Sequence, residues 1–382
     1  MSAFKIEGFC KERFERVKKA FERNFKEGLD VGASFAATLN GDYVIDIWGG
    51  YADAKKTKLW EKNTIANVYS TTKLMTALCT LMCVDRGLLN LDDPVSKYWP
   101  EFAQNGKEGI TVKHLLSHTS GLAGFEEKIH YKTLYDWDKI ISLLSAQKPW
   151  WTPGTKSGYH SLTHGFLLGE LVRRVTGKSL GTFFREEVAE PLKADFHIGM
   201  PEVHDSRVAE LIPPPPLDLK DLGNVDPNSI PIKVLMNPII SPKLTKTREW
   251  CNAEIPAANG QGNARSVARI ASILSCGGEY NNFKLLSSNI LEQSIQEQSY
   301  GMDLVLGLPI RFGLGWGLTS KEMPLGPNPR TFFWGGWGGS MVIIDLDARL
   351  SIAFVMNKMV STTTGDPRTI RLISAIYRSL KS

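Results

Sequence analysis

Ser70 and Lys73 are the residues of this chain whose types and spacing best suit nucleophilic chemistry. They lie at the start of the segment VYSTTKLMTALCTLMCVDRG, and residues 74–84 are apolar on nearly every side, which predicts a buried helix. A lysine in the first turn of such a helix opposes the helix dipole and loses its hydration. Both effects lower the pKa of its amine, and a spacing of three places it on the same helix face as the serine. We therefore expect Lys73 to act as a base for the hydroxyl of Ser70.

The sequence alone leaves a second interpretation of this pair open. The S-x-x-K pattern also occurs at Ser2 and Lys5, at the tip of the chain, so the spacing by itself is weak. A serine at a helix start is also commonly an N-cap. If Ser70 is instead a nucleophile, the helix start offers its backbone N–H to an oxyanion.

A second acid or base is needed, and Tyr159 is the preferred candidate. It lies in WWTPGTKSGYHSLTHG, in a turn rich in proline and glycine just before a predicted helix, and Ser161 follows it. From this position Tyr159 could pass a proton between Ser70 and a leaving group. The same Y-x-[NS] spacing occurs at Tyr280 and Tyr377, so spacing does not choose among the three tyrosines.

The segment TFFWGGWGGSMVIIDLD places paired glycines directly before a predicted strand. Glycines at such an edge let a substrate approach the backbone closely, which suits an oxyanion site. The alternative is that they form a bulge or a tight bend.

Together these segments resemble the serine β-lactamase and penicillin-binding-protein superfamily, and most closely the esterases related to class C β-lactamases, called family VIII carboxylesterases. The resemblance spans most of the chain and includes HLLSHTSGL (114–122), WTPGTKSGYHSLTHG (151–165) and EIPAANGQGNARSVARI (254–270). It implies that Ser70 is the acylated nucleophile, Lys73 its base partner and Tyr159 the tyrosine of the family. It also implies that Trp334, Gly335 and Gly336 stand where the lactamases have Lys-Thr-Gly, with the N–H of Trp337 joining that of Ser70 at the oxyanion.

The chain departs from the lactamase pattern at two positions. Trp334 in place of the lysine removes a cation that could hold a substrate carboxylate. Ser161 stands where many lactamases have asparagine, so an amide that would bind the acylamido group is missing. Both changes favour neutral esters, whose apolar part we expect in a pocket with aromatic lining. The candidate lining residues are Trp150, Trp151, Trp316 and Phe125, beside Trp334 and Trp337.

The order of predicted helices and strands indicates an α+β fold. We expect an antiparallel sheet flanked by helices, with an inserted, mostly helical region. Two apolar runs flank Asn40-Gly41, a strong hairpin signal, and residues 340–346 and 350–356 form a second strand pair. Helices are predicted for the segment with Phe14, Val17, Phe21 and Phe25, for TVKHLLSHTSG, SLTHGFLLGELVRRVTG, SLGTFFREEVAEPL and AANGQGNARSVARIASIL, and from Pro367 to Leu380. A Pro-rich passage at about 212–243 is expected to lack regular structure. We expect one domain from residues 1–75 and 255–382, and a helical domain from 76–254.

Bulk properties exclude several classes of protein. The net charge is +5 without a basic stripe, which argues against nucleic-acid binding. Five scattered cysteines do not suggest a disulfide framework, and no apolar run is long enough for a membrane span. The N-terminal segment lacks the apolar core of a secretion signal, so a cytoplasmic location is expected.

Two other chemistries are disfavoured. His114 and His118, and likewise His160 and His164, are spaced four apart on predicted helices, but neither pair has the glutamate of H-E-x-x-H, so no metal site is expected. The G-x-S-x-G elbow of α/β-hydrolases is absent.

The sequence thus predicts a cofactor-independent serine esterase that hydrolyses small carboxylic esters, with a short-chain or apolar acyl group, through an acyl-enzyme at Ser70. The open alternatives are a β-lactamase or D-amino-acid peptidase, an acyltransferase to a small alcohol, and a catalytically silent binding scaffold. The sequence does not predict the oligomeric state.

Overall fold

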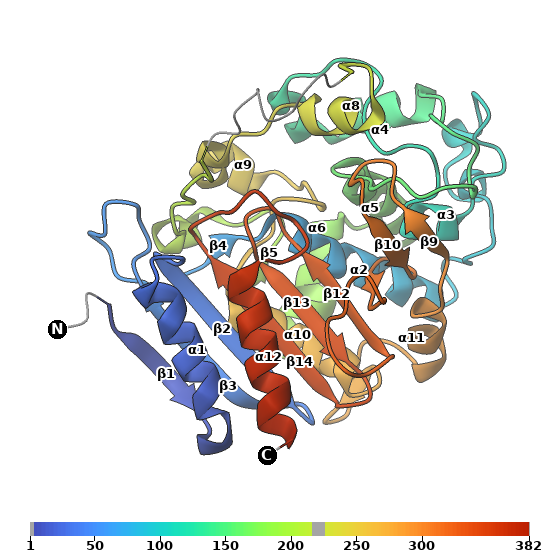
Figure 1. Cartoon of the computed structure of the whole chain (residues 1–382). Coiled ribbons are helices and arrows are strands. Elements are labelled where there is room, and N and C mark those ends of the chain that lie inside the picture. The colour runs from blue at the N-terminus through green and yellow to red at the C-terminus, as the bar shows by residue number, and fades with distance from the viewer. Residues whose placement is uncertain (1–3, 216–225, 382) are drawn as a thin grey trace.

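The structure is a computed structural model that describes residues 4–215 and 226–381. A sheet of nine antiparallel strands runs through it (Figure 1). Its N-terminal and C-terminal strands meet in the middle, where β2 pairs with β14. In spatial order the strands are β1 (Ile6–Cys10), β3 (Asp42–Gly50), β2 (Gly32–Leu39), β14 (Leu350–Met356), β13 (Met341–Asp345), β12 (Thr331–Gly335), β11 (Gly317–Leu318), β10 (Pro309–Phe312) and β9 (Ser299–Met302).

Both predicted strand pairs are confirmed. Asn40 and Gly41 connect β2 to β3 with φ angles of 51° and 85°. Both residues therefore occupy the left-handed region that a two-residue hairpin turn requires. β13 pairs with residues Leu350–Phe354 of β14, and the bounds of both strands lie within one residue of the predicted limits.

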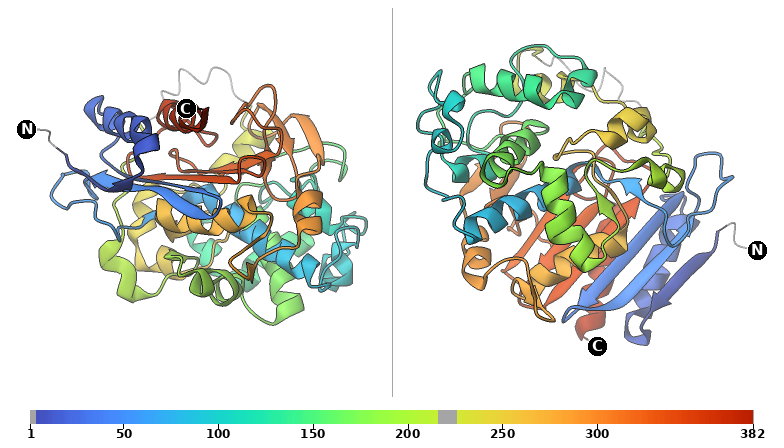
Figure 2. Two further views of the ribbon diagram at one scale, coloured as in Figure 1. Left: turned by 90° about the horizontal axis from the view of Figure 1, so that it is seen from below. Right: turned by 180° about the vertical axis from the view of Figure 1, so that it is seen from behind.

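Helices cover both faces of the sheet (Figure 2). α1 (Glu15–Lys26) and α12 (Pro367–Lys381) lie side by side on one face, where Val17, Phe21 and Phe25 of α1 are buried as their spacing predicts. On the other face α10 (Ala264–Ser275) packs against β2, β13 and β14. The predicted α+β class, an antiparallel sheet flanked by helices, is thus confirmed.

The middle of the chain forms most of the remaining helices. α2 (Thr72–Asp85) is buried over nearly its whole length, as the apolar segment predicts, and packs against α5 (Thr163–Thr176) and α6 (Leu180–Phe184). A π-helical turn continues α6 into α7 (Glu190–Leu192). The other helices are α3 (Val112–Leu116), α4 (Trp137–Ala146), α8 (Ile230–Met236), α9 (Arg248–Asn252) and α11 (Ser288–Ser294). The short strands are β4 (Ala66–Asn67), β6 (Gln261–Gly262) and β5 (Phe196–His197) in one small sheet, and β7 (Glu279–Tyr280) with β8 (Phe283–Lys284) in another.

Two predictions about helices were wrong. α3 ends at Leu116, and His118 has a φ of 60°, so His114 and His118 do not share a helix. His160 likewise lies before the start of α5, whereas His164 lies within it. In each pair the spacing of four residues is that of a helix, but a helix boundary falls between the two histidines: α3 ends before His118, and α5 begins after His160.

The Pro-rich passage is also more regular than predicted. Residues 230–236 form α8, because Pro231 occupies the first turn, where a helix needs no N–H donor. A 3-10 turn follows at Pro242–Lys246. Residues 216–225 of this passage, and Ser2 of the alternative S-x-x-K pair, lie outside the described residues.

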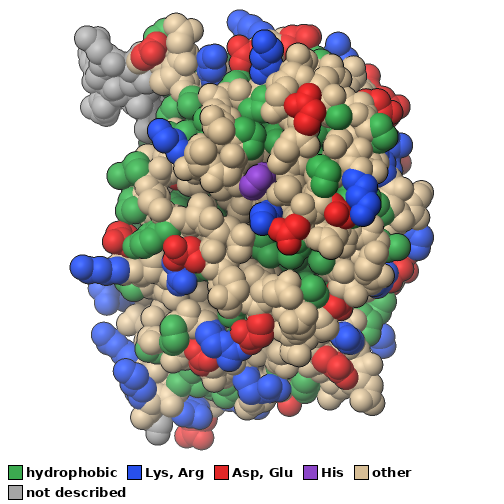
Figure 3. All heavy atoms as spheres, turned by 90° about the vertical axis from the view of Figure 1, so that its right-hand side faces the viewer, with side chains coloured by type: hydrophobic (Ala, Val, Ile, Leu, Met, Phe, Trp, Pro, Cys, Tyr) green, Lys and Arg blue, Asp and Glu red, His purple; other side chains and the backbone are tan. Residues whose placement is uncertain are grey.

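The described surface carries charges of both signs. The face shown in Figure 3 has Lys and Arg side chains interspersed with Asp and Glu, without a stripe of one sign. Among the helices of the described ranges, none combines the length and apolar character that a bilayer-spanning segment needs.

Candidate active site

Ser70 lies in a 3-10 turn, Tyr69–Thr71, that leads into α2. Tyr69 has a φ of 44°, a left-handed conformation that costs energy in any residue but glycine and is often found at functional sites. The cap position of α2 is Thr71 rather than Ser70, so the N-cap interpretation of Ser70 is wrong. The hydroxyl of Ser70 instead contacts Lys73 and Tyr159.

Lys73 is completely buried, and its Nζ has three neighbours. It lies 3.1 Å from Ser70 Oγ, 2.6 Å from the carbonyl oxygen of Ser161 and 3.0 Å from that of Ala257. Burial lowers the pKa of Lys73 well below its ordinary value. A neutral amine suits this environment, because its two hydrogens match the two carbonyls and its lone pair can accept the hydrogen of Ser70.

The structure brings Tyr159, and neither of the other two candidate tyrosines, to Ser70. The hydroxyl of Tyr159 donates to Ser70 Oγ at 2.5 Å. The hydroxyls of Tyr280 and Tyr377 donate instead to Asp42 and Asp345. Burial raises the pKa of Tyr159 above its ordinary value, so this hydroxyl keeps its proton at neutral pH.

Asp303 holds the backbone of Tyr159 in place, a role that the sequence did not reveal. One of its carboxylate oxygens accepts from the N–H groups of Tyr159, Val305 and Leu306 at 2.9–3.0 Å. The carboxylate is almost fully buried and joins the turn before β10 to the turn that carries the tyrosine. An isolated aspartate 144 positions from Tyr159 gives no local signal for this contact.

Three buried histidines surround this group without adding charge to it. Burial lowers the pKa of His118, of His164 and of His160, the last to about 4. All three imidazoles are therefore neutral near pH 7. The ring of His118 stacks on those of His164 and Trp334, with centroids 4.5 Å and 5.5 Å apart. As neutral rings, the three imidazoles place no further positive charge near Lys73.

The glycines at the end of β12 are required by close contacts with the protein's own backbone. A Cβ atom on Gly336 would lie 2.1 Å from the carbonyl oxygen of Val68, just before the nucleophile turn, and one on Gly335 would lie 2.2 Å from that of Thr363. The hydroxyl of Ser340 stabilises the same contact, because it donates a hydrogen bond to the Val68 carbonyl at 2.8 Å. The paired glycines thus let the strand edge lie against the turn of Ser70.

Two backbone N–H groups at this junction are available to a ligand. Across the described residues, the turn and loop hydrogen bonds leave the N–H groups of Ser70 and Trp337 unused. The ring of Trp337 packs on that of Tyr69, with centroids 5.1 Å apart, so the two segments are in contact. Paired N–H donors beside a nucleophile are the arrangement that stabilises an oxyanion.

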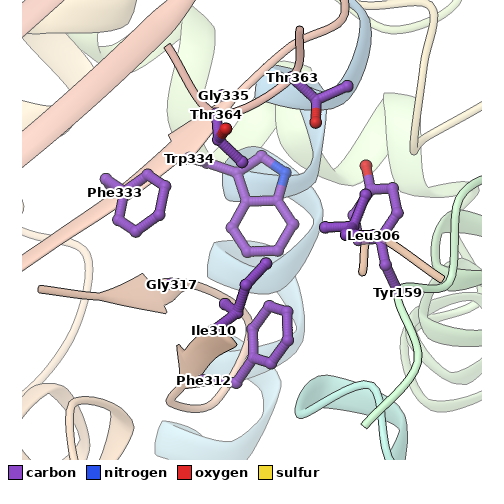
Figure 4. A pocket seen from close by; sticks show the side chains of 10 residues that line it. All are labelled: Tyr159, Leu306, Ile310, Phe312, Gly317, Phe333, Trp334, Gly335, Thr363 and Thr364. Atoms are coloured by element: carbon purple, nitrogen blue, oxygen red, sulfur yellow. The ribbon is translucent and has the colours of Figure 1, made fainter. Parts of the chain in front are cut away.

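A cleft of about 330 Å³, including the solvent at its mouth, lies beside these groups (Figure 4). Its walls are mostly apolar. The lining residues are Tyr159, Leu306, Ile310, Phe312, Gly317, Phe333, Trp334, Gly335, Thr363 and Thr364. Of the predicted lining residues Trp334 lies in this cleft, and Gly335, which was predicted at the oxyanion edge, also contributes to its lining. The sequence did not predict the lining residues between Leu306 and Phe312. They are distant from Ser70 in the sequence and line the cleft because β9 and β10 pair at the edge of the sheet.

The other aromatic candidates lie elsewhere. Trp316 is in the core, where its indole donates to the carbonyl of Ser294, and Phe125 is buried. Trp150 and Trp151 are partly exposed, and their indoles donate to Glu126 and to the carbonyl of Lys156. Ser161 contributes its carbonyl to Lys73.

Comparison with known proteins places this arrangement in a family. Residues 21–375 match the family described as Beta-lactamase. The chain is 32% identical to "Esterase/beta-lactamase LipL" of Mycobacterium tuberculosis, over 94% of this chain and 84% of that protein. Its structure is similar to that of a family VIII carboxylesterase, with a TM-score of 0.91, 40% identity and coverage of 98% and 100% of the two chains. A penicillin-binding-protein homologue from Caulobacter crescentus gives a TM-score of 0.92 at 38% identity, with the same coverage.

The matched residues, 21–375, cover most of the chain and include Ser70, Lys73, Tyr159 and the glycine-rich edge. The chain therefore belongs to the beta-lactamase family of serine enzymes.

Proposed function

We propose that this protein is a carboxylesterase-type serine hydrolase that cleaves neutral carboxylic esters through an acyl-enzyme at Ser70. The observation that carries the proposal is the chain of contacts from Tyr159 through Ser70 to Lys73, in which one hydroxyl faces both a buried amine and a buried phenol. Relatives named as esterases and a carboxylesterase of the same fold support it.

Acylation uses the two neighbours of Ser70 in different ways. Lys73 Nζ accepts the proton of the Ser70 hydroxyl while Oγ forms a bond to the ester carbonyl carbon. The N–H groups of Ser70 and Trp337 hold the negative oxygen of the tetrahedral intermediate. When the bond to the alcohol breaks, Tyr159 gives its proton to the leaving oxygen.

Lys73 then returns the proton to the Tyr159 phenolate, since both groups lie within hydrogen-bond distance of Ser70 Oγ. Deacylation repeats the steps with water in place of the alcohol. The raised pKa of Tyr159 and the lowered pKa of Lys73 suit these roles, since Tyr159 keeps a proton to donate and Lys73 loses its proton more readily than an exposed lysine does.

Replacement of the nucleophile tests the proposal. We expect the parent protein to hydrolyse p-nitrophenyl butyrate and Ser70→Ala to lose about 10³-fold or more of kcat/KM. Intact mass spectrometry should show an acyl adduct on the parent and none on the variant. Full turnover by Ser70→Ala would overturn the assignment.

Cleavage of β-lactams is a second candidate activity, because a relative at 32% identity is named both esterase and beta-lactamase. The neutral, apolar surroundings of Trp334 favour esters over carboxylate-bearing lactams. If the protein hydrolysed nitrocefin with a higher kcat/KM than p-nitrophenyl butyrate, β-lactams and not esters would be its preferred substrates.

A further inference from the structure

The indole N–H of Trp334 has no role in the chemistry proposed above. The side chain is only 4% exposed, and its Nε1 is a buried atom without a hydrogen-bond partner among the described residues. Most buried indole N–H groups are paired, as that of Trp250 is with Asn67 at 2.9 Å. The indoles of Trp60 and Trp99 are unpaired within the described ranges too, but neither of them lines the active-site cleft.

The position of this donor distinguishes it from the others. Trp334 lines the cleft together with Tyr159 and Thr363, and Figure 4 shows its indole nitrogen on the edge of the ring that faces these two residues. The ring is almost fully buried and stacks on that of His118 at an angle of 14°, which restricts its rotation. A fixed and desolvated donor binds an acceptor without first releasing a water molecule.

The cleft beside Trp334 receives the alcohol part of the ester. Tyr159 gives its proton to the leaving oxygen, so this oxygen lies at the tyrosine hydroxyl. The ring of Tyr159 forms one wall of the cleft, and its centroid is 6.2 Å from that of Trp334. The carbons that follow the leaving oxygen therefore lie against the wall that these two rings form together.

The character of the cleft restricts what the N–H can bind. Its lining side chains carry no formal charge, and an indole N–H donates one hydrogen bond without neutralising an anion. A carboxylate would lose its hydration there without a cation to pair with. An uncharged oxygen, in an ether or a second ester carbonyl, can accept the bond and still suit the apolar walls.

We propose that Trp334 is a specificity-determining residue whose N–H binds an uncharged oxygen in the alcohol part of the substrate. The preferred substrates are then esters of alkoxy alcohols or of partly acylated polyols rather than esters of plain alkanols. This inference rests on the proposed function, since it assumes ester cleavage at Ser70.

Matched esters test the inference. The pairs are 2-methoxyethyl with n-butyl butyrate, and 3-methoxypropyl with n-pentyl butyrate, in which one oxygen replaces one methylene. The measured quantity is the ratio of kcat/KM for the ether ester to that for the alkyl ester, in the parent and in Trp334→Phe. Comparing the ratio between proteins cancels the chemical difference between the alcohols. We expect the ratio to fall about five- to tenfold in Trp334→Phe for at least one pair.

Two further variants complete the test. Replacing Trp334 by benzothienylalanine keeps the shape of the indole but exchanges N–H for sulfur, so it should lower the ratio as phenylalanine does even if phenylalanine disturbs folding. Trp137→Phe removes an indole N–H that donates to Glu170, outside the cleft lining, and should leave the ratio unchanged. Equal ratios in the parent and both Trp334 variants would overturn the inference while Ser70-dependent hydrolysis remained. Failure of the parent to cleave any of the four esters would count against the proposed function itself.

Discussion

Neither Lys73 nor Lys107 is exposed to solvent, but the two side chains have different surroundings. Both are completely buried, and each Nζ has three oxygen neighbours. For Lys107 all three are backbone carbonyls, of Gln104, Ser145 and Gln147, at 2.6–2.8 Å. For Lys73 one of the three is instead the hydroxyl of Ser70.

The hydroxyl in place of one carbonyl distinguishes the catalytic role proposed for Lys73 from the structural role of Lys107. Three carbonyls can only accept, so Lys107 leaves one of them without a donor whenever it loses a proton. A hydroxyl can also donate, so Lys73 is fully paired as a neutral amine. Burial lowers the pKa of Lys107 to about 8 and that of Lys73 well below its ordinary value. Burial thus makes both amines easier to deprotonate, but only Lys73 has a proton to accept in return.

The largest effect is expected for Lys73→Met. This change removes the base while keeping a side chain of similar length, so kcat/KM on p-nitrophenyl butyrate should fall by about 10³-fold or more. Circular dichroism and thermal unfolding check that the fold persists. If the variant keeps more than a tenth of the parent activity, the contrast between the two lysines has no catalytic meaning.

The pH profile should carry the signature of Lys73 alone. Because the neutral amine is the active form, kcat/KM on an uncharged ester should fall about tenfold for each pH unit below the pKa of Lys73, and activity should be retained above it. The midpoint should lie well below the ordinary lysine value of 10.5. His160, with a pKa of about 4, is too acidic to produce a limb near neutrality.

A profile recorded in Lys107→Met serves as the control. The acidic limb should keep its midpoint in this variant. A midpoint near 10.5 in the parent, or a shift of the limb in the control, would contradict the assignment.

A smaller loss is expected from Gly336→Ala. The new methyl group would meet the Val68 carbonyl at 2.1 Å and push the strand edge away from the turn of Ser70, which should lower kcat by about tenfold to 100-fold. Gly109, near Lys107, is the matched control, since a Cβ there would meet nothing within 4 Å. Equal activities of Gly336→Ala and Gly109→Ala would show that the close contact is dispensable.

The smallest effect on turnover is expected for Lys107→Met. Three buried carbonyls lose their donor, so the free energy of unfolding in urea should fall by about 2 kcal/mol. Turnover should stay within about twofold of the parent value, because Lys107 lies outside the site. A loss of kcat without a loss of stability would show that the region around Lys107 communicates with the site.

Local signals in the sequence predict the parts of the molecule that depend on neighbours along the chain. The Asn40-Gly41 turn, the buried helix after Ser70 and the spacing of Lys73 are of this kind, and each appears in the structure. The choice of Tyr159 over the other tyrosines also agrees with the contact found at Ser70.

Features that depend on distant segments were not predictable in this way. The carboxylate of Asp303 reaches Tyr159 only after β9 and β10 join the sheet, and the left-handed turn at His118 forms against the ring of Trp334. The helical periodicity around His118 therefore misled the prediction, since packing across the chain overrode it. At Pro231 the error was the opposite one: irregular structure was predicted, but a helix begins there, because proline is favoured in the first turn of a helix although it breaks a helix further on.

The contact between Ser340 and Val68 has a consequence for how the protein is made. The two residues are 272 positions apart, yet their hydrogen bond fastens the nucleophile turn to the strand edge. During synthesis at about 5–20 residues per second, Ser70 leaves the ribosome on the order of tens of seconds before that edge exists. The growing chain therefore carries its nucleophile without an oxyanion partner, and it gains catalytic power only when β12 and β13 dock in the middle of the sheet.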